Sequence, residues 1–187
     1  VSDRLGETMN NFLKIAGGID IMPLLLAIRR RGAEIWKEDT YLRDYPQGPF
    51  GEIESVILRF PPRSVHQSEE ALKNHLEGFD QHENVDQPVF KLLPEARAIV
   101  FALMNAVQGE RLGRVMINKI APGGVIYPHA DTPAHAEYYS RFHVVLQSSP
   151  GVVFRCGDEQ VYMATGEVWW FNNKLEHEVI NNSGSDR

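Results

Sequence analysis

The residues of this chain that could do chemistry lie in its C-terminal part, where two histidines and an aspartate could meet. His129 and Asp131 close a short apolar run, and in an extended segment residues two apart project from the same face, so both can reach one point. A third ligand would come from another strand, and His177 is the best candidate. Two imidazoles and one carboxylate on one face form the triad that holds non-haem Fe(II) and leaves positions open for substrates and oxygen. We therefore predict that His129, Asp131 and His177 are the metal ligands and catalytic residues.

Arg187 follows His177 by ten residues and adds a group of another kind. Its planar guanidinium can bind a carboxylate through two hydrogen bonds, which allows a cosubstrate that carries a carboxylate. Each residue also has a plainer interpretation. In a chain with seven histidines one His-x-Asp match is expected by chance, and Asp131 could cap a turn. His177 and His143 could be strand residues bonded to carbonyls, and Arg187 a solvated end. Their order within one β-rich segment favours the metal site.

The elements that would position these residues are short strands. Seven β-rich runs separated by turn residues follow residue 113, which indicates a β-sandwich or barrel. The runs are Arg114–Ile120, Val125–Tyr127, Arg141–Leu146, Val152–Arg155, Gln160–Met163, Glu167–Phe171 and His177–Ile180.

The N-terminal part, residues 1–113, reads as mixed and partly helical. One helix is expected from an N-cap at Asp20 to Gly32, and another from Pro94 to Gly109, with a strand over Glu54–Phe60. The polar segment 67–84 is expected to be partly helical. We expect one domain, residues 1–187, in which 1–113 packs on a β core formed by 114–187.

Composition narrows the class of protein. Apolar residues make up 43% and charged residues 24%, as in ordinary globular domains, and the formal net charge of −6 disfavours a nucleic-acid partner. The single cysteine, Cys156, cannot form an internal disulfide, so we expect a reducing, cytoplasmic setting. The longest apolar run, 19–28, is too short and too interrupted for a membrane span, so we expect no membrane partner.

The stretch from Asn118 to Arg187 resembles the aspartyl/asparaginyl β-hydroxylase family of Fe(II)- and 2-oxoglutarate-dependent oxygenases, which includes the cis-proline hydroxylases. The matching pieces are Pro-Gly before Tyr-Pro-His at 127–129, Arg-Phe-His-Val-Val-Leu at 141–146, Phe-Arg-Cys at 154–156, and Gly-Glu-Val-Trp-Trp-Phe-Asn-Asn-Lys-Leu-Glu-His-Glu-Val at 166–179. The resemblance implies a double-stranded β-helix, a cupin-like jelly roll, with flanking helices. It also implies hydroxylation of an amino acid or a peptidyl aspartyl, asparaginyl or prolyl side chain, with Fe(II), 2-oxoglutarate and O2.

The resemblance assigns roles to individual residues as well. His129 and His177 match the two iron-binding histidines, and Arg187 matches the arginine that binds the distal carboxylate of 2-oxoglutarate. Arg141 and His143 match an Arg-x-His that lies near the other end of the cosubstrate or behind the metal. Asn118 stands where animal members have a serine near the cosubstrate.

Two departures from the family pattern qualify these roles. Animal members have glycine where this chain has Asp131, so the full triad is expected here, as in the cis-proline hydroxylases. The family also normally continues beyond the arginine into one more strand, whereas this sequence stops at Arg187. Substrate identity stays open between a free amino acid and a peptidyl residue.

Candidate substrate contacts lie before residue 114. They are aromatic and cationic side chains: Trp36, Tyr41, Arg43, Arg59 and His66. Two other functions remain as alternatives, a cupin-like metal enzyme that does not use 2-oxoglutarate and a non-catalytic β-sandwich binding module.

Overall fold

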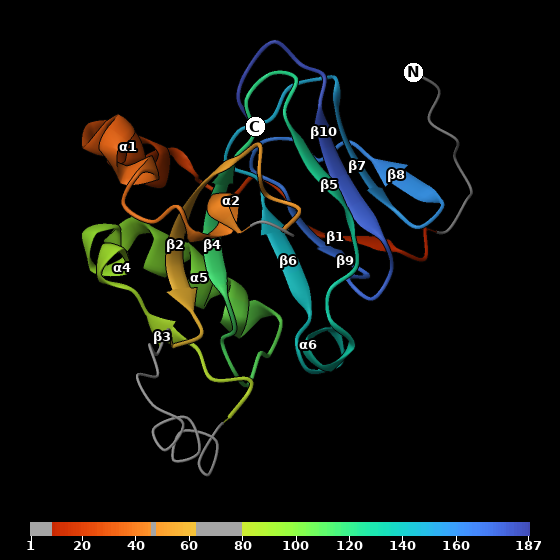
Figure 1. The fold of residues 1–187 in the computed structure, drawn as a ribbon, viewed down its shortest axis with the longest axis horizontal. Helices are drawn as coiled ribbons and strands as arrows, with labels where there is room; N and C mark the ends of the chain where they lie inside the picture. Colours follow the sequence, from red (N-terminus) through yellow and green to blue (C-terminus); the bar gives the residue numbers. More distant parts are fainter. Residues whose placement is uncertain (1–8, 46–47, 63–79) are drawn as a thin grey trace. The chain divides into compact units, whose positions relative to one another are not determined.

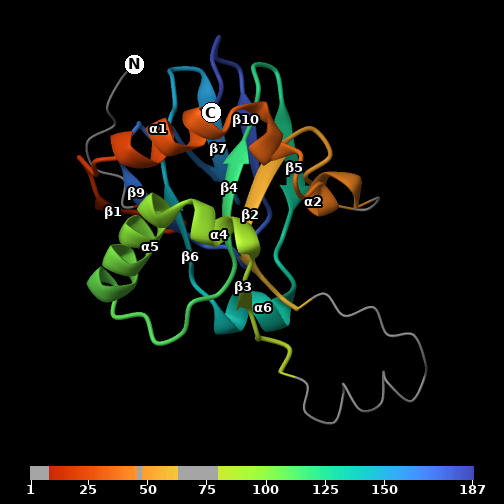
Figure 2. The ribbon, with the colours of Figure 1, turned by 90° about the vertical axis from the view of Figure 1, so that its left-hand side faces the viewer.

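The computed structural model describes residues 9–45, 48–62 and 80–187, and within them the chain is mostly antiparallel β-sheet with few helices (Figure 1). Its strands form a four-stranded sheet in the order β5-β10-β7-β8 and two three-stranded sheets, β1-β9-β6 and β3-β2-β4. Figure 2 shows β7, β10 and β5 side by side in this order. The strands are β1 (Phe12–Ala16), β2 (Glu54–Phe60), β3 (Val85–Asp86), β4 (Val115–Lys119), β5 (Val125–His129), β6 (Arg141–Val144), β7 (Val152–Cys156), β8 (Glu159–Val161), β9 (Val168–Phe171) and β10 (His177–Asn181).

The seven strands expected after residue 113 are all present, and β2 matches the strand expected at 54–60. The sequence pattern missed β1, which pairs with β9 although the two are far apart in the chain. It also missed the two-residue strand β3. The residues of β1, Phe-Leu-Lys-Ile-Ala, do not alternate between apolar and polar, and β3 is too short to carry any periodic pattern.

The expected helices are confirmed as α1 (Met22–Arg31) and α5 (Pro94–Ala106). The N-cap of α1 is Ile21 and not Asp20, whose carboxylate accepts a hydrogen bond from the Met22 amide at 3.1 Å. Further short helices are η1 (Ala33–Trp36), α2 (Tyr41–Asp44), α4 (Pro88–Leu92) and α6 (Pro133–Tyr138). None of the helices in the described part of the chain has the length and apolar character that crossing a bilayer requires.

Two compact units make up the chain. One joins the residues up to Ser55 to Asn118–Arg187, and the other is Val56–Ile117. The first unit contains the four-stranded sheet and the β1-β9-β6 sheet, and therefore all the residues proposed as metal ligands.

The core of the first unit draws on both of its sheets. Phe12 of β1 and Phe171 of β9 contact Phe154 of β7, with the Phe154 and Phe171 ring centroids 4.8 Å apart. Residues alternate between buried and half-buried along β7 and β10, so one face of each strand is turned into the core. The same alternation buries His177 on the face that carries Val179.

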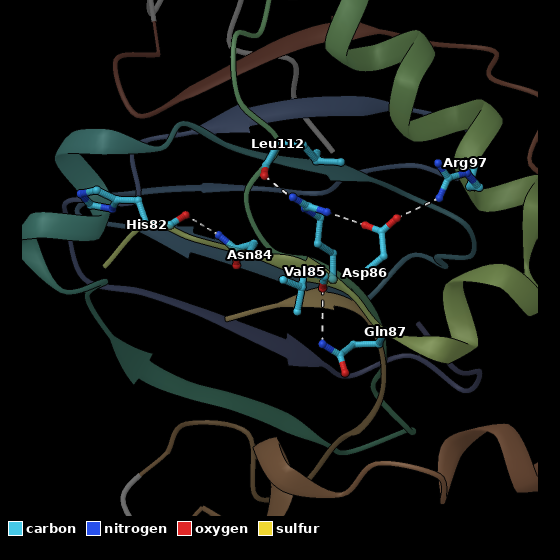
Figure 3. A network of polar contacts seen from close by, with 8 residues as sticks. His82, Asn84, Val85, Asp86, Gln87, Arg97 and Leu112 are labelled. Atoms are coloured by element: carbon cyan, nitrogen blue, oxygen red, sulfur yellow. Dashed lines mark hydrogen bonds and ion pairs between the residues drawn. The ribbon is translucent and has the colours of Figure 1, made fainter. Parts of the chain in front are cut away.

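The second unit contains a polar network centred on Asp86 of β3 (Figure 3). Arg59 Nη1 lies 2.5 Å from one carboxylate oxygen of Asp86, and Arg97 Nη1 lies 3.0 Å from the other. Arg59 Nε also donates to the Leu112 carbonyl. Arg59, a candidate substrate contact, thus already has an acidic partner within its own unit. Residues 63–79 lie outside the described residues, and they include His66 and most of the segment 67–84 that is expected to be partly helical.

Candidate metal centre

The two histidines of the candidate centre face each other on adjacent strands. His129 ends β5 and His177 begins β10, and the two are direct partners in the antiparallel register. Their ring centroids are 4.3 Å apart, with an angle of 54° between the ring planes. Phe50 packs edge-on against His129 at 5.6 Å between centroids and supplies an apolar wall.

A β-bulge in β5 sets the direction of His129. His177 pairs with His129, but Val179 pairs with Ile126. Two residues of β5 therefore lie between its paired positions, whereas one residue of β10 lies between the corresponding positions. In a regular strand Ile126 and His129 would point to opposite faces; the extra residue puts both on the side that His177 and Val179 occupy. Pro128 lies within the bulge, where a residue without an N–H is tolerated.

Hydrogen bonds fix which ring nitrogen of each histidine is free. His129 Nδ1 lies 2.7 Å from the Tyr127 carbonyl, and His177 Nδ1 lies 2.9 Å from the Leu175 carbonyl. A carbonyl only accepts, so each Nδ1 carries the proton and each Nε2 keeps a lone pair. Both Nε2 atoms are buried and have no hydrogen-bond partner within the described chain. Leaving two such acceptors unsatisfied is costly, and a metal ion would satisfy both.

Burial also keeps the rings neutral. It lowers the pKa of His177 to about 4 and lowers the pKa of His129 below its usual value, although the carbonyl hydrogen bonds act in the opposite direction. A metal can bind only the unprotonated imidazole, so both rings are in the binding form at neutral pH.

Asp131 completes a group whose ligand atoms all lie within 4.8 Å of one another. Its Oδ1 lies 2.9 Å from Arg141 Nη2, and its Oδ2 accepts a hydrogen bond of 2.8 Å from Asn173 Nδ2. Two imidazole nitrogens and a carboxylate suit a divalent first-row metal such as Fe(II), so the residues present fit the predicted ion.

The side chains of Arg141 and His143 project from the same face of β6, since the two residues are two apart in the strand. Arg141 is paired with Asp131, so in this structure it contacts a proposed ligand of the metal. His143 packs against Phe154 and Phe171, with ring centroids 4.9 and 5.2 Å away. Burial, followed by the charges of Arg187 and Arg141, lowers the pKa of His143 well below its usual value, so this ring is neutral.

Arg187 is held by its backbone, which exchanges two hydrogen bonds with Ile120: the Arg187 amide donates at 2.9 Å and its carbonyl accepts at 2.8 Å. Its Nε is buried without a hydrogen-bond partner, and it pairs with no carboxylate of the described residues. Burial lowers the pKa of Arg187 to about 10, which leaves the guanidinium charged at neutral pH. Asn118, two residues before Ile120, accepts a hydrogen bond of 2.8 Å from the Ser55 hydroxyl.

The remaining candidate substrate contacts already have protein partners. Arg43 pairs with the neighbouring Asp44, Trp36 lies under the Lys119 ammonium, and the Tyr41 ring packs on Tyr45. These contacts do not point to a role in substrate binding.

Sequence reasoning missed Asn173 altogether. Its side chain is 4% exposed and contacts Asp131, from which it is 42 residues distant in the chain. The only signal in the sequence is the pair Asn172-Asn173, which marks a turn and gives no indication of its partner.

A comparison with models of known protein families gives a match. The model of the aspartyl/asparaginyl beta-hydroxylase family matches residues 68–187, more than half of the chain. The matched range includes both histidines, Asp131 and Arg187. A search of curated proteins finds no match.

Proposed function

Because the chain belongs to the aspartyl/asparaginyl beta-hydroxylase family, we propose that it is an Fe(II)- and 2-oxoglutarate-dependent dioxygenase that hydroxylates an amino acid or a peptidyl side chain. One observation carries the proposal. Two buried imidazole Nε2 atoms without a hydrogen-bond partner in the described chain converge with a carboxylate, and this is a ligand set that non-haem Fe(II) oxygenases use.

His129, Asp131 and His177 would hold the metal. When bound, Fe(II) supplies the activation of O2, which is coupled to the oxidation of 2-oxoglutarate to succinate and CO2 and to the insertion of one oxygen atom into a substrate C–H bond. The chain's part is to keep both imidazoles neutral by burying them, and to orient them by the two carbonyl hydrogen bonds. Phe50 and the buried ring of His177 limit the access of water.

Arg187 would bind the distal carboxylate of 2-oxoglutarate. A buried guanidinium without an acidic partner is costly, and a carboxylate from a ligand would offset that cost. The paired hydrogen bonds with Ile120 hold its backbone in place before the ligand arrives. Arg141, His143 and Asn118 remain the proposed contacts of the rest of the cosubstrate, with Arg141 shared between it and Asp131.

The proposal extends to the fold of the strands that carry the metal centre. From β5 to β10 the chain alternates between the four-stranded sheet and the β1-β9-β6 sheet, with the β7–β8 hairpin as the one local step. This alternation is what a double-stranded β-helix requires. We propose such a fold for the strands that carry the centre, within a single oxygenase domain.

The test begins with anaerobic protein loaded with Fe(II). We expect 2-oxoglutarate to produce a weak visible absorption band, and we expect O2 to release succinate in the presence of the correct substrate. The substrate screen covers free proline, other amino acids, and peptides that contain aspartate or asparagine. Protein that binds no metal would support a non-catalytic binding module instead.

A matched pair of arginine variants tests the cosubstrate. Arg187→Met removes a charge-assisted contact of about 1.5–3 kcal/mol, so the Kd for 2-oxoglutarate should rise roughly 10- to 150-fold while the affinity for metal stays the same. Arg29→Met removes a guanidinium from the exposed last turn of α1 and should change neither. If Arg187→Met binds metal and responds to 2-oxoglutarate as the wild type does, the result would favour a cupin-like enzyme that uses no such cosubstrate.

A further inference from the structure

Asp131 is the one proposed metal ligand that does not lie within a β-strand. His129 and His177 lie within β5 and β10, where the backbone ladder fixes them. Asp131 lies after the end of β5 and before α6, outside any strand. Its position must therefore come from contacts other than the ladder.

Asn173, in the turn between β9 and β10, makes two contacts with Asp131. Its Nδ2 donates to Asp131 Oδ2 at 2.8 Å, and its carbonyl accepts from the Asp131 amide at 3.3 Å. The second amide hydrogen of Asn173 faces the Tyr139 carbonyl at 3.5 Å. Asn173 thus bonds both the side chain and the backbone of Asp131, and its own burial restricts its rotamer.

Arg141 and Asn173 act on different oxygens of Asp131 and bring different charges. Arg141 places a positive charge beside Oδ1, which attracts the carboxylate but repels a metal cation. Asn173 is a neutral donor, so it orients Oδ2 without opposing the ion. We infer that Asn173 is the positioning residue that holds Asp131 in the geometry for metal binding, an inference that rests on the proposed function.

Co(II) affinity under chelator-free conditions tests this role without turnover, because Co(II) has a visible spectrum and prefers the same ligands. Asn173→Ala should weaken Co(II) binding about 10- to 100-fold, as loss of a hydrogen bond to a metal ligand does. Asn172→Ala is the matched control: within the described part of the chain the Asn172 side chain hydrogen-bonds only to Asn11, at 3.5 Å, so the affinity should stay at the wild-type value. Unchanged affinity in Asn173→Ala would overturn the inference.

A double-mutant cycle separates positioning of Asp131 from a general effect of the turn, which also leads into His177. Asp131→Ala alone should weaken Co(II) binding, and adding Asn173→Ala to it should cause no further loss. A further loss of the same size would mean that Asn173 acts through the turn, which would contradict the inference. If Asp131→Ala and His177→Ala both bind Co(II) as the wild type does, the metal site and the proposed function fail instead.

A measurement on the wild-type protein covers the case in which Asn173→Ala does not fold. In protein labelled with 15N at asparagine, Zn(II) should shift the side-chain amide resonances of Asn173 and leave those of Asn172 in place, with the latter assigned from Asn172→Ala. No shift at Asn173 would reject the inference.

Discussion

Protonation of His177 should destabilise the metal-free protein in mildly acidic solution. Burial disfavours the imidazolium and lowers the pKa of His177 to about 4 in the folded protein, against 6.5 for an ordinary histidine. The unfolded chain therefore takes up this proton at a higher pH than the folded chain does. The stability due to neutral His177 is complete above about pH 6.5 and falls as the pH drops toward 4.

The size of the effect follows from the two pKa values. A gap of roughly 2.5 units corresponds to about 3 kcal/mol in full, and about 2 kcal/mol of it should be lost by roughly pH 5. This is a large share of a typical unfolding free energy of about 5–15 kcal/mol.

Denaturant unfolding of metal-free protein at several pH values between about 7.5 and 5 measures the loss. His177→Gln lacks the titrating group, so its unfolding free energy should fall by about 2 kcal/mol less than that of the wild type over this range. Comparing the change with pH, and not the absolute stabilities, removes any fixed cost of the substitution. Equal losses in the two proteins would refute the argument that His177 lies neutral in a dry site.

Three further substitutions test other parts of the structure. Phe154→Ala removes a ring that is 2% exposed and contacts Phe12 and Phe171, so it should lower the unfolding free energy by about 3–5 kcal/mol in denaturant titrations. Asn181→Ala removes a buried amide that donates to Ile120 and Ser185; we expect a cost of about 1–3 kcal/mol and weaker 2-oxoglutarate binding, because the released segment carries Arg187, and wild-type binding would contradict this link. Burial raises the pKa of Asp86, but its two arginine partners lower it by more, so the net pKa lies below its usual value. Asp86→Asn should therefore cost about 1 kcal/mol at neutral pH, and this difference from wild type should disappear as the pH falls through the lowered pKa of Asp86, where the wild-type carboxylate takes up a proton.

Much of the β architecture was predictable because it is encoded locally. Each run after residue 113 combines β-branched and aromatic residues with turn residues at its ends, and every one of them forms a strand. The helix at α5 follows from apolar spacing alone. The N-terminal strand β1 was not predictable, because its residues do not alternate between apolar and polar and its partner, β9, lies about 150 residues away.

By itself, the sequence determined which residues could bind a metal: His129 and Asp131 from their spacing, and His177 from its place in a later strand. Only the tertiary structure decided how they meet. The bulge at Tyr127–Pro128 turns His129 to the face of His177, and Asn173 reaches Asp131 across the chain from the β9–β10 turn. A pattern along the chain records which face a residue takes within its own strand, whereas register shifts and contacts between distant turns depend on how the strands pair.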